Sequence, residues 1–157
     1  MSAERRINID AELVEFVKDL SDPDSDNRVF NSMAQCLAFA AAYGYKNNAR
    51  EKISKAPTSK VDPIAYHIFE NNHFDRLFVM LAMVSVEDPK NILGDQEAPS
   101  NKRVTIFEEY AKGGLKLLKS KISGVVDYLD PILEITLVSE EIKKHPSGFD
   151  ITDLKHK

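Results

Sequence analysis

Apolar residues recur at helical spacing along most of the chain and predict an all-α protein. Positions i, i+3, i+4 and i+7 share one face of an α-helix, so this spacing is typical of amphipathic helices. The alternation in RINI, residues 5–8, instead predicts a short N-terminal strand or extended arm. We expect a compact bundle of about five helices, over residues 10–20, 28–43, 63–85, 101–122 and 125–144.

The most apolar of these segments is RVFNSMAQCLAFAAAY, residues 28–43. Its second half is apolar on nearly every face, and such a helix is buried on most sides. We therefore place it at the centre of a single helical domain that spans residues 1–157. Gly44 follows it, and glycine commonly ends a helix.

Turn-forming residues predict the breaks between helices. Residues 46–60 contain few apolar side chains and predict a mobile loop. The pair Asp62–Pro63 predicts a helix start, because proline fits the first helical position. The pair Asn71–Asn72 leaves open whether residues 63–85 form one helix or two. We expect residues 145–157 to form a loosely attached tail.

Two glycines lie inside the helical pattern of IFEEYAKGGLKLL, residues 106–118. Each interior glycine costs a helix about 1 kcal/mol relative to alanine. Gly114 lies on the apolar stripe between Ala111 and Leu118, and Gly113 lies at its edge. Small residues allow the backbone of a neighbouring helix to approach closely. We therefore expect the helix to continue through both glycines, with Gly114 against the 28–43 helix.

Composition narrows the class of protein. The net charge is −4, which argues against a general polyanion binder. Cys36 is the only cysteine, so an intramolecular disulfide and a cysteine-type zinc site are excluded. The chain has no signal-peptide pattern and no run of about 20 apolar residues. We therefore expect a cytoplasmic protein without membrane association.

Basic residues gather in two places. Residues 46–60 carry five basic residues against one acid, and lysines recur along one face of the predicted 101–122 helix. A solvated loop and a solvated helix face are the simpler interpretation, and a phosphate-contacting surface is the alternative. The candidate nucleic-acid contacts are Lys46, Arg50, Lys52, Lys55, Lys112, Lys116, Lys119 and Lys121.

Catalytic or metal-binding patterns are weak. The chain carries no phosphate-binding loop, dinucleotide fingerprint or nucleophile elbow. Glu70, His73 and Asp75 in ENNHFD form the single cluster with acid–base chemistry, and a helix junction capped by Asn72 or His73 explains it more simply. Adjacent helix residues point in different directions, so Glu108 and Glu109 make a poor metal pair. We expect no metal and no cofactor.

Glu108 has a simpler expected partner. Lys112 follows it at i+4, with the glutamate on the N-terminal side, which is the favoured orientation for an ion pair on a helix. We therefore expect these two side chains to pair on the surface of the helix.

The stretch FEEYAKGGL resembles a motif of the DNA phosphorothioation (Dnd) system-associated protein 4 family. Lys112 stands where members usually carry asparagine. Residues 29–46 and 68–82 resemble two further helices of the family, in the same order. The residues that match the motif are Phe107, Glu108, Glu109, Tyr110, Ala111, Gly113, Gly114 and Leu115.

The resemblance implies a bacterial cytoplasmic protein in antiviral defence. Such systems replace a non-bridging phosphate oxygen of DNA by sulfur and restrict DNA that lacks the mark. The resemblance implies no catalytic residues. It leaves open whether the protein touches DNA, binds only other proteins of the system, or forms homo-oligomers.

Three hypotheses follow. The leading one is a non-catalytic accessory or adaptor protein that binds other proteins of the defence system. The second is a DNA-binding protein of the same system that acts in restriction or transcriptional control. The third is an enzyme centred on Glu70, His73 and Asp75.

Overall fold

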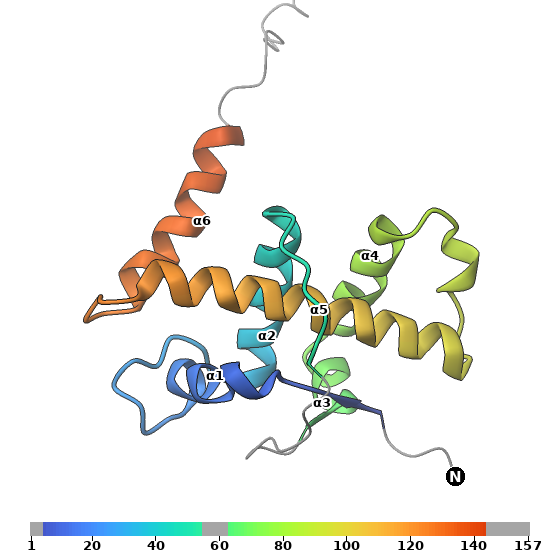
Figure 1. The fold of residues 1–157 in the computed structure, drawn as a ribbon, viewed down its shortest axis with the longest axis horizontal. Coiled ribbons are helices and arrows are strands. Elements are labelled where there is room, and N and C mark those ends of the chain that lie inside the picture. The colour runs from blue at the N-terminus through green and yellow to red at the C-terminus, as the bar shows by residue number, and fades with distance from the viewer. Residues whose placement is uncertain (1–4, 55–62, 144–157) are drawn as a thin grey trace, which may run out of the picture.

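The computed structural model describes residues 5–54 and 63–143, without the side chains of residues 138–143 (Figure 1). Helices α2 (Met33–Lys46) and α5 (Glu97–Ile122) organise it, and α5 lies across α2. The other helices are α1 (Val14–Ser21), α3 (Tyr66–Asn71), α4 (Asp75–Ser85) and α6 (Leu129–Lys143), with 3₁₀ turns η1 (Ala11–Leu13) and η2 (Pro89–Asn91). The predicted all-α class is confirmed.

A small antiparallel ladder joins the N-terminal segment to the middle of the chain. Strand β1 (Arg6–Ile7) pairs with β2 (Ile64–Ala65), so that Ile7 faces Ile64 across the ladder. The predicted N-terminal strand is therefore confirmed. The predicted helix start at Pro63 is wrong, because Ile64 and Ala65 take part in this ladder and α3 begins only at Tyr66.

Gly44 lies inside α2 and does not end it. The helix continues to Lys46, and the backbone N–H of Asn47 donates to the carbonyl of Tyr43. The helix also begins later than predicted, at Met33, where Ser32 caps it by accepting from the N–H of Gln35. The helix end predicted at Gly44 is therefore wrong. Glycine occupies this position inside the helix because a side chain there would prevent a close packing contact.

That contact is the crossing of α2 and α5. A methyl group placed on Gly114 would lie 1.8 Å from the carbonyl oxygen of Ala40, and one placed on Gly44 would lie 2.2 Å from that of Tyr110. One placed on Gly113 would lie 2.1 Å from the carbonyl oxygen of Ala49. Helix α5 runs through both glycines, and Gly114 lies against α2 as predicted. The backbones touch where any side chain would collide.

Aromatic side chains fill the core beside this crossing. The rings of Phe78 and Phe107 stack with centroids 3.9 Å apart. Phe69 meets both rings edge-on, at centroid distances of 5.4 and 5.6 Å. All three side chains are fully buried, and such aromatic pairs stabilise a fold beyond the area they bury. The cluster holds α3 and α4 against α5.

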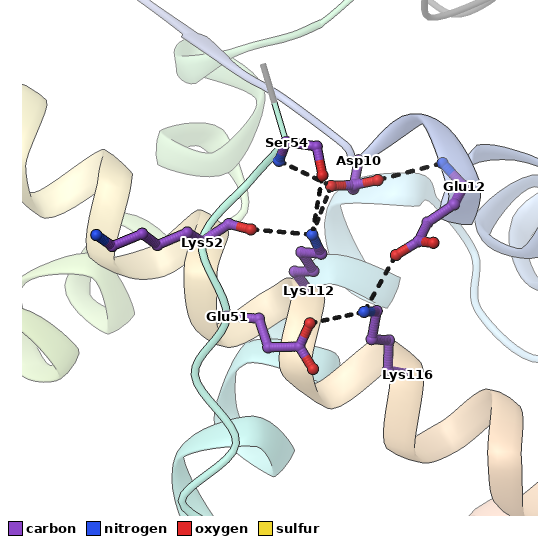
Figure 2. A network of polar contacts seen from close by, with 7 residues as sticks. All are labelled: Asp10, Glu12, Glu51, Lys52, Ser54, Lys112 and Lys116. Carbon is purple, nitrogen blue, oxygen red and sulfur yellow. Dashed lines mark hydrogen bonds and ion pairs between the residues drawn. The ribbon is translucent and has the colours of Figure 1, made fainter. Parts of the chain in front are cut away.

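The helix expected over residues 63–85 is divided. His73 adopts a φ of 61°, a left-handed backbone conformation that ends α3 and lets α4 begin at Asp75. Lys46, the first residue of the loop predicted over residues 46–60, belongs to α2 instead. The segment that includes Glu51 and Ser54 follows α5 (Figure 2), and the N–H of Glu51 donates to the carbonyl of Glu109 at 3.1 Å. The mobility of the loop stays a prediction. Residues 55–62 and the predicted tail at 145–157 lie outside the described residues.

Gly114→Ala tests the crossing of α2 and α5, because helix propensity and packing predict changes of opposite sign in the free energy of unfolding. Helix propensity alone predicts a gain of about 1 kcal/mol in the free energy of unfolding. The contact with Ala40 predicts a loss of about 1–3 kcal/mol, because the crossing has no room for a methyl group. Urea denaturation measures the difference. Ala42→Gly on the exposed side of α2 is the control and should lose about 1 kcal/mol from propensity alone.

Candidate functional site

The residues that resemble the family motif lie in the middle of α5, and their charged side chains contact two other segments of the chain. One is the N-terminal segment of β1 and η1, and the other is residues 49–54, which follow α2. Figure 2 shows the polar contacts at the centre of this arrangement. We call these contacts the α5 polar network: it comprises Asn8, Asp10, Glu12, Arg50, Glu51, Lys52, Ser54, Glu108, Glu109, Lys112 and Lys116.

A buried ion pair lies at the centre of the network. The Nζ of Lys112 is 2.8 Å from the Oδ2 of Asp10, and the side chains are only 6% and 4% exposed. Lys112 also donates to the carbonyl of Lys52 at 2.9 Å and to the Oγ of Ser54 at 3.4 Å. The ammonium group therefore has three partners in place of water, which offsets much of the cost of burying it.

Asp10 has its own set of donors. Its Oδ2 accepts from the backbone N–H of Ser54 at 3.1 Å, and its Oδ1 accepts from that of Glu12 at 3.2 Å. Burial alone would raise the pKa of Asp10, but the contact with Lys112 and the two N–H groups outweigh it and lower the pKa. Asp10 also caps η1.

Lys116 repeats this arrangement one turn further along α5. Its Nζ lies 2.7 Å from Glu51 and 3.2 Å from Glu12. Hydrogen bonds to these two carboxylates raise the pKa of Lys116. The side chains are 40–55% exposed, so water screens the attraction and the pairs add little stability. They do neutralise the charge of Lys116.

Glu109 fixes the beginning of the 49–54 segment. Its carboxylate lies 2.5 Å from the Nε of Arg50, and its backbone carbonyl accepts from the N–H of Glu51 at 3.1 Å. The Arg50 guanidinium also lies over the ring of Tyr110, 5.5 Å from the centroid.

Glu108 holds the N-terminal segment. Its Oε1 accepts from the backbone N–H of Asn8 at 2.9 Å and from the Asn8 side-chain amide at 3.2 Å. Burial raises the pKa of Glu108 to about 7, against the lowering effect of both Asn8 bonds. The expected surface pair of Glu108 with Lys112 is wrong, because Lys112 points to Asp10 and both side chains are buried.

The candidate nucleic-acid contacts do not form one basic face. Lys112 is buried, and Arg50 and Lys116 pair with carboxylates. Lys119 lines a depression of about 710 Å³ together with Lys18 and five acidic residues. Its acids are Glu15, Asp19, Asp22, Asp24 and Asp26. Of the other candidates, Lys46, Lys52 and Lys121 are exposed, and Lys55 lies outside the described residues.

The ENNHFD cluster forms a helix junction. The N–H of His73 donates to the carbonyl of Glu70 at 2.9 Å, and both side chains are exposed. The amide of Asn72 donates to the carbonyl of Ile68, so Asn72 caps the end of α3. The predicted cap on the next helix is wrong, since α4 begins after Phe74 with no side-chain cap. Within residues 5–54 and 63–137, no three His, Cys, Asp or Glu side chains could hold a metal ion.

Sequence reasoning missed three buried or network residues. Asn8 and the ionic role of Asp10 depend on contacts about 100 positions away in sequence. Arg103 is also buried, and it donates to the carbonyls of Ile92 and Gly94 and to the Oγ of Ser100. It thereby fixes the loop before α5. The sequence offers one signal for the burial of Arg103: it is a charged residue on the apolar side of the predicted 101–122 helix.

A comparison with known protein families gives a match that spans almost the whole chain. Residues 6–155 match the family described as DNA sulphur modification system-associated protein 4. The chain belongs to this family. The match includes both sides of the α5 polar network, from Asn8 to Lys116. Searches of curated proteins and of solved structures each found no match.

Membership agrees with the resemblance read from FEEYAKGGL and places the protein in association with a DNA sulphur modification system. Among the described residues, no helix has the length and apolar character needed to cross a membrane.

Lys112→Met should destabilise the protein by about 3–5 kcal/mol, because it leaves the Asp10 carboxylate buried without its cation. Urea denaturation measures the loss. The double variant Asp10→Asn/Lys112→Met should lose less than the sum of the single variants, since the two side chains interact directly. Lys119→Met, on an exposed position of the same helix, should change stability by less than about 0.5 kcal/mol. Equal effects of the two lysine variants would contradict the buried pair.

Glu108→Gln should alter the pH dependence of stability. The folded state holds the Glu108 proton more tightly than the unfolded chain, so its contribution is fully present below the ordinary pKa of 4.5. That contribution is lost as the pH rises through about 7. Glutamine can accept both Asn8 bonds without a charge, so the variant should be more stable than the parent at pH 8, by roughly 1–3 kcal/mol. The gain should shrink toward pH 4.5, whereas Glu15→Gln at an exposed position of α1 should show no such trend.

Proposed function

We propose that this protein is a non-catalytic, cytoplasmic accessory subunit of a DNA sulphur modification system with a role in antiviral defence, and that it binds other proteins of the system. Family membership supports the system. The observation that carries the accessory role is the use of the charged side chains in the motif and directly after it: Glu108, Glu109, Lys112 and Lys116 each contact another segment of the same chain.

This use of charge differs from what catalysis requires. A catalytic group must reach a substrate from a cleft, with partners that tune it for proton transfer or attack. Glu108 is the motif group whose pKa lies near neutrality, but it is buried under Asn8 and accepts both donors of that residue. Its geometry suits a role in holding the N-terminal segment.

DNA binding is the second candidate. The exposure of Lys46, Lys52, Lys119 and Lys121 favours it, since each lysine that neutralises a phosphate strengthens binding in a salt-dependent way. Two features weigh against it: Lys112 and Lys116 are paired within the chain, and Lys119 lines a depression in which acids outnumber bases.

Affinity purification with the proteins of the sulphur modification system separates the two roles. We expect the tagged protein, co-expressed at native levels with the other genes of its system, to retain at least one of their products after nuclease treatment. The complex should persist in a Lys52→Glu/Lys121→Glu variant, because protein binding does not need these lysines.

A tagged protein that retains none of these products would contradict the accessory role. A gel mobility shift that weakens steeply with salt and disappears in the Lys52→Glu/Lys121→Glu variant would support DNA binding in its place.

A further inference from the structure

Helix α6 is apolar on two faces. On the inner face, Ile132 is buried, and Tyr128 and Ile135 pack partly buried against the core. On the outer face, Leu129, Leu133 and Leu137 are 44%, 47% and 60% exposed. A surface helix with a single partner usually presents polar residues on its outer side. We call these three leucines the α6 leucine stripe.

The stripe is continuous and stands clear of the core. Residues at i, i+4 and i+8 lie above one another along a helix, so the three leucines form one row. Val125 and Val126, which precede the helix, extend the apolar surface and are 41% and 93% exposed. Figure 1 shows α6 leaving the end of α5 and pointing away from the other helices. Single exposed apolar residues are ordinary, but a contiguous row marks an interaction surface.

Acidic residues border the stripe. Asp130 and Glu134 each follow a stripe leucine by one position, which places them along one edge of the row. Asp127 precedes the helix, and residues 125–137 contain no lysine or arginine. Glu134 also lines a depression of about 430 Å³ with Lys46 and Lys121, so Asp127 and Asp130 are the acids of this edge that lie outside that depression. Two copies of α6 packed against each other would bring like charges together, which disfavours a second copy as the occupant.

We propose that the α6 leucine stripe binds an amphipathic helix of another protein of the sulphur modification system, in which lysine or arginine residues flank the apolar face. This inference rests on the proposed accessory role and assigns that role to one surface. The apolar row supplies the contact area, and the acidic edge selects a basic partner and sets its orientation.

A second exposed apolar surface provides a matched control. Met80, Met83 and Val84 on α4 are 62%, 44% and 57% exposed. No acid lies within this row, so it lacks the charge selection of α6. Met80 and Leu137 differ by only 2% in exposure, so Met80→Asp and Leu137→Asp make equivalent changes on two different surfaces.

The experiment is affinity purification of the full-length chain, co-expressed with the other genes of its sulphur modification system. The parent should retain a partner protein. Leu137→Asp should reduce the retained partner at least tenfold, and Met80→Asp should leave it unchanged. Asp130→Asn should weaken retention and reduce its sensitivity to salt, because it removes one charge from the acidic edge. Circular dichroism and thermal unfolding of each variant confirm that it folds.

The outcomes separate the inference from the proposed function. Retention by the parent and by the leucine variant alike would overturn the inference and leave the accessory role intact. Loss of the partner in Met80→Asp would also overturn it, because the binding surface would then lie on α4. Retention of nothing by the parent would overturn both. A parent dimer in light scattering that the leucine variant abolishes would identify a second copy as the occupant and overturn the basic-partner assignment.

Discussion

The close crossing of α2 and α5 is the constraint on which the rest of the structure depends. Gly44 and Gly114 leave no side chain between the two helices, and each faces a backbone carbonyl of the other helix. Dispersion attraction falls steeply with distance, so backbone atoms in direct contact gain from this approach. The gain offsets the propensity cost of interior glycine. Gly113 extends the contact to Ala49, just beyond the end of α2.

The contact at Ala49 positions the polar network. Because Ala49 lies on Gly113, the segment that follows it runs along α5 within reach of Glu109, Lys112 and Lys116. The N-terminal segment closes over the same helix from the other side, where Glu108 and Lys112 receive Asn8 and Asp10. The part of α5 from Glu108 to Lys116, about two and a half turns, thus fixes two segments that are distant in sequence. Buried ion pairs often add little net stability, but they penalise any arrangement that leaves one charge unpaired.

This arrangement explains the motif FEEYAKGGL by its role in the fold. Its glycines set the distance between two helices, and its charged residues set the positions of two connecting segments. The motif is therefore explained by folding, and the partner surface that we propose lies elsewhere. Helix α6 is the clearest such surface, since its inner face packs on the core while its outer leucines remain exposed.

The sequence by itself determined the elements whose cause is local. Helical periodicity predicted the helices, and alternation in RINI predicted β1. The position of Gly114 on the apolar stripe predicted its contact with α2. The predictions that concerned charge failed at Lys112 and Glu108, because an i+4 spacing says nothing about a partner that arrives from another segment.

The tertiary structure alone decided which charges are buried. Asp10 reaches Lys112 across 102 positions and Asn8 reaches Glu108 across 100, distances over which periodicity carries no information. The same holds for Gly44, which resembles a helix end in sequence and is a helix interior in the fold, because α5 requires the space of its missing side chain. Local propensity sets where helices form, and the approach of distant segments sets what their side chains do.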